Sequence, residues 1–171
     1  QFSLPPSFTD NMLMAAPDAI TKYTTAIFLL GRYLLKMVLP LGLTFDLSYP
    51  SLPFEGPGDL GFIISALVLI AMLLVAIMQF KSKNIISFAL LFFFITASVS
   101  SNIFVIIGTH WGERLMYLPS WGIAFSLVLA VAFLIEKYSS LNRKSLAMIF
   151  VIPVIIYSGM SIARNPVWEN N

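Results

Sequence analysis

The sequence has no cysteine, a single histidine and little charge. The lack of cysteine excludes disulfides, thiol catalysis and zinc-thiolate sites, and one histidine disfavours a catalytic metal site built from the usual protein ligands. Only 11% of the 171 residues are charged, against about 25% in soluble domains. Ten Lys and Arg against eight Asp and Glu are too few basic groups to indicate nucleic-acid binding. No Gly-rich phosphate loop, Ser-His-Asp arrangement or HExxH motif is present, so no complete active site is apparent.

The sequence has long apolar runs instead, and 58% of its residues are hydrophobic. This composition predicts an all-α integral membrane protein with four transmembrane helices, at residues 60–80, 85–108, 115–135 and 145–163. The first run has 21 uncharged residues, which matches the ~20 needed to span the hydrocarbon. Ser98, Ser100, Ser101 and Asn102 interrupt the second run, so we expect that helix to break near residue 100.

A fifth helix is predicted at residues 19–38, with Asp18 as its N-cap. Lys22, Arg32 and Lys36 form a basic stripe on this otherwise apolar helix. Such a stripe is typical of a helix that lies in the membrane interface. A spanning helix with Arg32 turned inward is the alternative.

The orientation follows from two basic turns, which contain Lys81 and Lys83 in the first, and Lys137, Arg143 and Lys144 in the second. The positive-inside rule places these turns in the cytoplasm. The loop around Asp46 and the stretch between residues 101 and 122 then face outward.

That stretch, SNIFVIIGTHWGERLMYLPSWG, places His110, Glu113 and Arg114 between two apolar runs. If it is helical, His110, Arg114, Tyr117 and Trp121 share one face, which could hold an anion. Glu113 could orient the Arg114 guanidinium, whose planar fork suits a phosphate. Two alternatives remain. In the first, the helix begins near Pro119 and the charged residues lie in a loop before it. In the second, Arg and Tyr at such a boundary only anchor the helix to lipid headgroups.

The same stretch resembles a family signature, roughly SN, an apolar run and ERxxYxPSxG, at Ser101, Asn102, Glu113, Arg114, Tyr117, Pro119, Ser120 and Gly122. Two other patches match in the same order along the chain. One comprises Asp10 and Asn11 with Arg32, Tyr33, Pro40, Leu43, Asp46, Ser48 and Tyr49, and the other is the tail at Arg164, Asn165 and Trp168. Together they resemble the transmembrane O-mannosyltransferases targeting cadherins and their bacterial relatives that carry tetratricopeptide repeats.

The resemblance implies that residues 1–171 are the C-terminal portion of a multi-pass, GT-C type glycosyltransferase membrane domain. We expect the catalytic N-terminal part and the repeats to lie outside this sequence, so no catalytic residue is assigned here and the fragment alone should be inactive. The implied function is protein O-glycosylation, mannosyltransferase-like, from a polyprenyl-phosphate sugar. This chain would supply the phosphate-binding side, through Arg114 with His110, Tyr117 and Glu113. The secondary candidates are Arg32, Lys36, Asp46, Tyr49, Asp10, Asn11 and Arg164. For Asp10, Asp46 and Tyr49, ordinary capping of loops is the alternative.

No metal or cofactor is expected, and the lipid-linked sugar is treated as substrate. The expected partners are membrane lipid, the lipid-linked sugar, a protein acceptor and the rest of the same chain. We favour a bacterial inner membrane over the endoplasmic reticulum, with the site facing the periplasm or lumen. The same features also suit a transporter or lipid-binding segment, or a membrane scaffold without activity.

Overall fold

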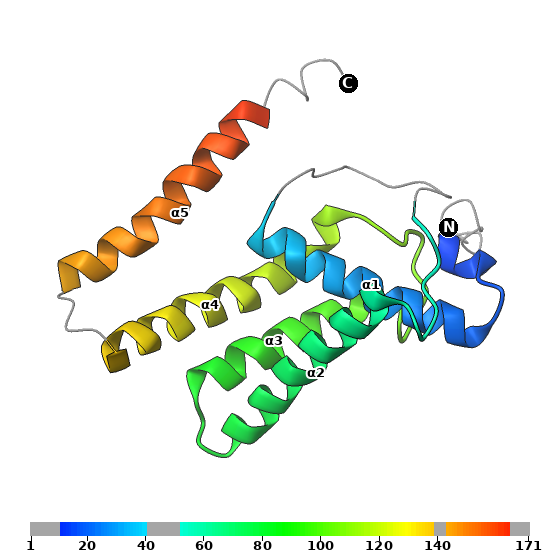
Figure 1. The fold of residues 1–171 in the computed structure, drawn as a ribbon, viewed down its shortest axis with the longest axis horizontal. Coiled ribbons are helices and arrows are strands. Elements are labelled where there is room, and N and C mark those ends of the chain that lie inside the picture. The colour runs from blue at the N-terminus through cyan, green and yellow to red at the C-terminus, as the bar shows by residue number, and fades with distance from the viewer. Residues whose placement is uncertain (1–10, 41–51, 139–142, 165–171) are drawn as a thin grey trace, which may run out of the picture. The chain divides into compact units, whose positions relative to one another are not determined.

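The computed structural model describes residues 11–40, 52–138 and 143–164 (Figure 1). All regular structure in these residues is helical, with no strand, so the prediction of an all-α chain is confirmed. The elements in chain order are η1 (Met12–Ala15), α1 (Ala19–Val38), α2 (Leu60–Phe80), α3 (Ile85–Ser100), η2 (Glu113–Met116), α4 (Tyr117–Tyr138) and α5 (Arg143–Arg164).

The chain divides into two compact units, Gln1–Ser126 and Leu127–Asn171, and the boundary lies within α4. The first unit holds α1, α2, α3 and the start of α4, and it contains the buried core. The second holds the rest of α4 and α5, which has Pro153 inside the helix. The apolar side chains of α5 from Val151 to Tyr157 are exposed. Unit one is therefore the part in which side chains from several elements converge.

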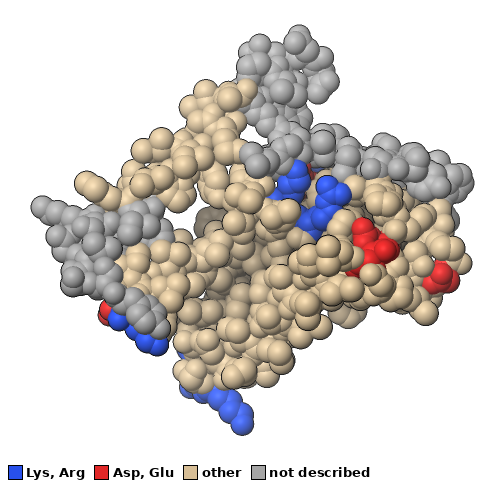
Figure 2. All heavy atoms as spheres, in the orientation of Figure 1, with Lys and Arg blue, Asp and Glu red and all other residues tan. Residues whose placement is uncertain are grey.

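Two helical segments of the described residues are long and apolar enough to cross a membrane, Leu60–Phe80 and Glu113–Lys137. Ile85–Ser100 and Val151–Ala163 are shorter apolar helices. Only 17% of the apolar window of α2 is buried, so most of its hydrophobic side chains face outward, unlike those of a core helix in a soluble protein. Figure 2 shows an uncharged surface between the basic α2–α3 turn and the charged side chains near α1. These features fit a membrane location, and two of the four predicted spans meet the length and composition needed.

Helix α3 is shorter than the predicted 85–108 segment, because it ends at Ser100, near the expected break. The hydroxyls of Ser98 and Ser101 donate to the carbonyls of Ile95 and Ser98, at 2.7 and 3.0 Å, and so engage backbone carbonyls near the helix end. Asn102 follows with a φ of 58°, the left-handed conformation that commonly terminates helices. At 1.5 Å per residue, 16 residues reach only about 24 Å.

Helix α1 has the predicted bounds, and the predicted N-cap is confirmed: the Asp18 carboxylate accepts the Thr21 amide hydrogen at 2.8 Å. Its apolar face packs on α2 and on the core, burying Ala26, Leu29, Leu30, Tyr33 and Leu34. Gly31 lies so close to Ser65 of α2 that a Cβ atom on it would be 2.1 Å from the Ser65 hydroxyl oxygen. The sequence therefore brings α1 and α2 together at a position where only glycine fits.

Candidate functional site

An open depression of about 290 Å³ lies between the end of α1 and the start of α4, within the first unit. The residues that line it are Tyr33, Lys36, Met37, Pro40, Glu113, Arg114, Met116, Tyr117 and Ser120. Arg114 and Tyr117 are exposed, and Lys36 and Glu113 are half-buried. The structure thus brings together three of the four principal residues predicted from the sequence, together with the secondary candidate Lys36.

The local backbone explains how these side chains reach one surface. Residues 109–112 are not helical, Glu113–Met116 form a single 3-10 turn, and α4 begins at Tyr117. Pro119 occupies the first turn of α4, where its missing amide hydrogen has no intrahelical partner to lose. The structure follows the alternative in which Pro119 opens the helix and the charged residues precede it.

The depression carries two cations and one carboxylate, from Lys36, Arg114 and Glu113. An arginine fork, an ammonium group and a tyrosine hydroxyl are all donors suited to an oxyanion. Met37, Pro40 and Met116 add apolar lining beside them. This arrangement can bind a phosphate that is attached to an apolar group.

His110 lies elsewhere. It is only 2% exposed, and its Nδ1 accepts the Met12 amide hydrogen at 3.4 Å. It is not among the residues that line the depression. The predicted helical face shared by His110, Arg114 and Tyr117 is wrong, because residues 109–112 are not helical and the 3-10 turn that follows breaks the 3.6-residue period.

Asn11, a secondary candidate, is fully buried and has structural contacts. Its side-chain nitrogen donates to the Asn102 side-chain oxygen and to the Ile107 carbonyl, both at 2.8 Å. Its own oxygen accepts the Leu13 amide hydrogen at 3.0 Å and caps η1. The Asn102 side chain also donates to the Thr109 carbonyl and accepts the Ile107 amide hydrogen. Two buried amides therefore hold the loop before the site.

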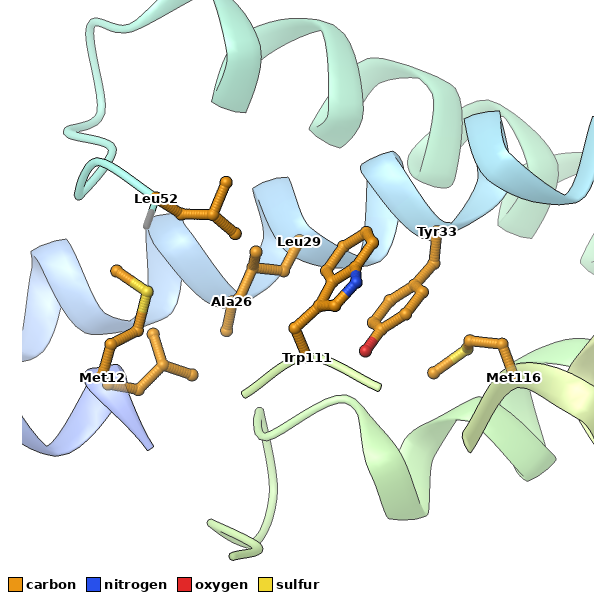
Figure 3. Close-up of a cluster of buried hydrophobic side chains, with 8 residues drawn as sticks. Met12, Ala26, Leu29, Tyr33, Leu52, Trp111 and Met116 are labelled. Atoms are coloured by element: carbon orange, nitrogen blue, oxygen red, sulfur yellow. The ribbon is translucent and has the colours of Figure 1, made fainter. Parts of the chain in front are cut away.

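Sequence reasoning missed the clamp between Tyr33 and the residues just before Glu113. The rings of Tyr33 and Trp111 stack at 4.1 Å with 5° between their planes (Figure 3). The Tyr33 hydroxyl accepts the Gly112 amide hydrogen at 2.7 Å. Both residues are almost fully buried, with Met12, Leu29 and Met116 around them. In the sequence, Tyr33 is only one of the residues that match the family pattern. No local pattern predicts its contact with Trp111.

Of the other secondary candidates, Arg32 does not line the depression. Arg32 lines a separate groove between α1 and α2. Arg164 is the last residue of α5, in the second unit. Asp10, Asp46 and Tyr49 lie outside the described residues. Within the part of the chain that the structure describes, no group of three or more His, Cys, Asp or Glu side chains could hold a metal ion.

The comparisons with known proteins find similarity to a mouse protein. No family model matches the chain, and no solved structure matches it. The sequence is 25% identical over 166 residues to mouse "Protein O-mannosyl-transferase TMTC1", which covers 93% of this chain and 18% of the relative. The chain thus spans about a fifth of the length of the curated relative that it matches. This similarity supports a distant relationship to the O-mannosyltransferase family, without pointing to a specific member.

Proposed function

We propose that this chain is part of a membrane protein O-glycosyltransferase that uses a polyprenyl-phosphate sugar, and that it contributes the side of the site that binds the lipid phosphate. The observation that carries the proposal is the convergence of Lys36 and Arg114, from segments far apart in the sequence, on one depression beside the start of α4. The distant similarity to a protein O-mannosyltransferase supports the reaction class.

The position of the depression suits a phosphate at the membrane surface. Helices α2 and α3 run in opposite directions, so α2 begins at the end of the bundle where α3 ends (Figure 1), and η2, which leads into α4, contacts α3. Thr25 of α1 contacts Glu55, shortly before α2, while Lys36 and Pro40 lie beside the first turn of α4. Thr25 and Lys36 of α1 are therefore both close to segments that lie at this end of the bundle. This arrangement favours an interfacial α1 over a spanning one.

In the proposed sugar transfer, this surface would stabilise the leaving phosphate. In the transfer, the bond between the anomeric carbon and the phosphate oxygen breaks, and the acceptor hydroxyl oxygen bonds to that carbon. The phosphate gains negative charge as it leaves, which fixed cations and donors stabilise. Arg114 is proposed to hold its oxygens, with Lys36 and Tyr117 as further donors and Glu113 as the residue that orients Arg114. The base that accepts the hydroxyl proton would come from outside this chain.

The site would face the periplasm or lumen, because the positive-inside rule places the α2–α3 turn with Lys81 and Lys83 in the cytoplasm. The carrier tail would lie against the apolar surfaces of α3 and α4. The start of α4 packs closely on α3, since a Cβ atom on Gly122 would be 2.6 Å from the Ala89 carbonyl.

The test is turnover of polyprenyl-phosphate sugars by the full-length protein, with Arg114→Ala, Arg114→Lys and the control Lys22→Ala. Lys22 is a cation of α1 that lies outside the depression. We expect Arg114→Ala to lower turnover by about two orders of magnitude or more. Arg114→Lys should recover part of the loss, because it keeps the charge without the fork, and Lys22→Ala should have no effect.

Unchanged turnover in correctly inserted Arg114→Ala would make Arg114 a headgroup anchor and contradict the donor-phosphate role. If the wild-type protein transfers none of several sugars tested, a transporter or an inactive scaffold becomes the better interpretation.

A further inference from the structure

The second cation of the α1 stripe, Arg32, lines a different hollow from Lys36. A groove of about 430 Å³ runs between α1 and α2. Besides Arg32, its larger lining side chains are apolar, including Leu35, Val38, Ile64 and Val68. Lys36, Glu113 and Arg114 are not part of its lining. Arg32 and Lys36 belong to one basic stripe in the sequence, and the structure places them in the linings of two different hollows.

Two glycines in the groove lining mark where α1 and α2 approach each other most closely. Gly31 faces Ser65, and Gly61 faces Phe28, whose ring would be 2.7 Å from an added Cβ atom. The side chains of Ser65 and Phe28 occupy the space that a Cβ atom would take at these positions. The large residues farther along, such as Leu35 and Val68, then form the walls of an open apolar channel.

Arg32 is held over aromatic rings and not by a carboxylate. Its guanidinium carbon lies 5.7 Å from the centre of the Phe28 ring and 5.6 Å from the Trp111 ring. Among the residues that the structure describes, Arg32 has no ion pair and no hydrogen bond. Aromatic faces fix the position of a guanidinium but leave its five N–H donors available. A half-buried cation in this state attracts an anion.

We propose that this groove binds an anionic membrane phospholipid, with its phosphate on Arg32 and an acyl chain along α2. Val68 is eight residues after Leu60, which places it about 12 Å along the helix axis from the start of α2. Leu35, Ile64 and Val68 are 58%, 53% and 45% exposed, so they offer apolar surface to a chain that descends from the headgroup. A headgroup with net negative charge complements Arg32 better than a zwitterionic one, which carries its own cation.

This lipid site is independent of the donor site, because the two hollows share no lining residue. An occupant of the groove would hold α1 against α2 and would contact Arg32, whose neighbour Trp111 stacks on Tyr33. The phospholipid would thus brace the clamp that positions the residues before Glu113.

The test uses the full-length protein in phosphatidylcholine nanodiscs that contain a minor share of phosphatidylglycerol, with retained lipid counted by native mass spectrometry. We expect the wild type to retain phosphatidylglycerol in preference to phosphatidylcholine. Arg32→Gln should lower that retention about tenfold, since a charge-assisted contact is lost. Val68→Trp should lower it as well, because it fills the channel and leaves Arg32 intact. The control Lys22→Gln removes a cation from the same helix outside the groove and should retain the lipid.

Arg32→Lys addresses the case in which Arg32→Gln does not fold, because it keeps the charge and should bind with intermediate affinity. Wild-type retention in Arg32→Gln or in Val68→Trp would overturn the proposal. Displacement of phosphatidylglycerol by added polyprenyl phosphate in an Arg32-dependent manner would also overturn it, since the groove would then belong to the donor.

Discussion

The α1–α2 pair and the loop at residues 101–112 lie next to each other but are stabilised in different ways. The two helices satisfy their own backbone groups, and they meet through small residues at Gly31 and Ser65. The loop has no regular structure, and its backbone groups are bonded to buried side chains, above all those of Asn11, Asn102 and Tyr33. Close approach therefore fixes the helices, whereas polar side chains fix the loop that precedes the candidate site.

The largest expected effect comes from breaking the helix contact with Gly31→Leu. Its Cβ atom would lie 2.1 Å from the Ser65 hydroxyl oxygen, 2.4 Å from its Cβ and 3.0 Å from its Cα, so the helices must separate. We expect the free energy of unfolding to fall by about 3 kcal/mol or more, measured by thermal unfolding in detergent.

Gly159→Leu is the matched control, because nothing in the described structure lies within 4 Å of a Cβ atom there. It should leave stability unchanged or slightly raised, since leucine favours helix more than glycine. Two results would contradict this: Gly31→Leu unfolds at the wild-type temperature, or adding Ser65→Gly to it restores no stability. Either result would mean that the close contact at Gly31 is not what holds α1 on α2.

The helices could be predicted from the sequence because their signals are local. The uncharged run between Asp59 and Lys81 gives α2 its bounds, and the Asp18 cap gives α1 its start. The end of α3 is marked by serines and an asparagine within five residues of each other. These signals depend on neighbours in the chain, so they can be read without a structure.

The loop could not be predicted in the same way, because its partners are distant in sequence. Asn11 and Asn102 are 91 positions apart, and Tyr33 and Gly112 are 79 apart. A polar residue in such a pair resembles any exposed loop residue until its partner is known. For the candidate site, residue types predicted Arg114, Glu113 and Tyr117, whereas the place of His110 depended on a backbone path that the helical period did not describe.

An intermediate effect is expected from Asn102→Ala, which removes hydrogen bonds that hold the loop at residues 101–112. The change removes three side-chain hydrogen bonds, with Asn11, Ile107 and Thr109, and places alanine at a φ of 58°. Buried groups that lose their partners cost about 1–3 kcal/mol, so we expect the free energy of unfolding to fall by about 2 kcal/mol. Hydrogen exchange at the Ile107 amide should accelerate.

Asn84→Ala is the matched control, because Asn84 is exposed and bonds only locally, to the Ile86 amide at 2.9 Å. It should cost about 1 kcal/mol or less. Asn102→Gly separates the two causes, since glycine accepts the left-handed φ but cannot form the hydrogen bonds. Wild-type stability in Asn102→Gly would mean that backbone conformation, and not the amide network, accounts for the loss.

The smallest expected effect is at Asp18, a polar contact that is exposed and not buried. Hydrogen bonds from the Thr21 backbone amide and hydroxyl lower the pKa of the Asp18 carboxyl below its ordinary value of 3.8. A lowered pKa means that the ionised carboxylate adds stability above pH 3.8, and that this stability disappears as the pH falls through the lower, folded-state value.

In Asp18→Asn the cap keeps an acceptor oxygen but does not titrate. Melting temperatures of both proteins, measured from neutral pH to below 3.8, should therefore differ slightly at neutral pH and converge in acid, and added salt should shrink the difference at neutral pH. If the difference in melting temperature persists in acid, the Asp18 cap acts through hydrogen-bond geometry alone, as the buried amides of the loop do. The charge of Asp18 would then not distinguish this exposed contact from the buried ones.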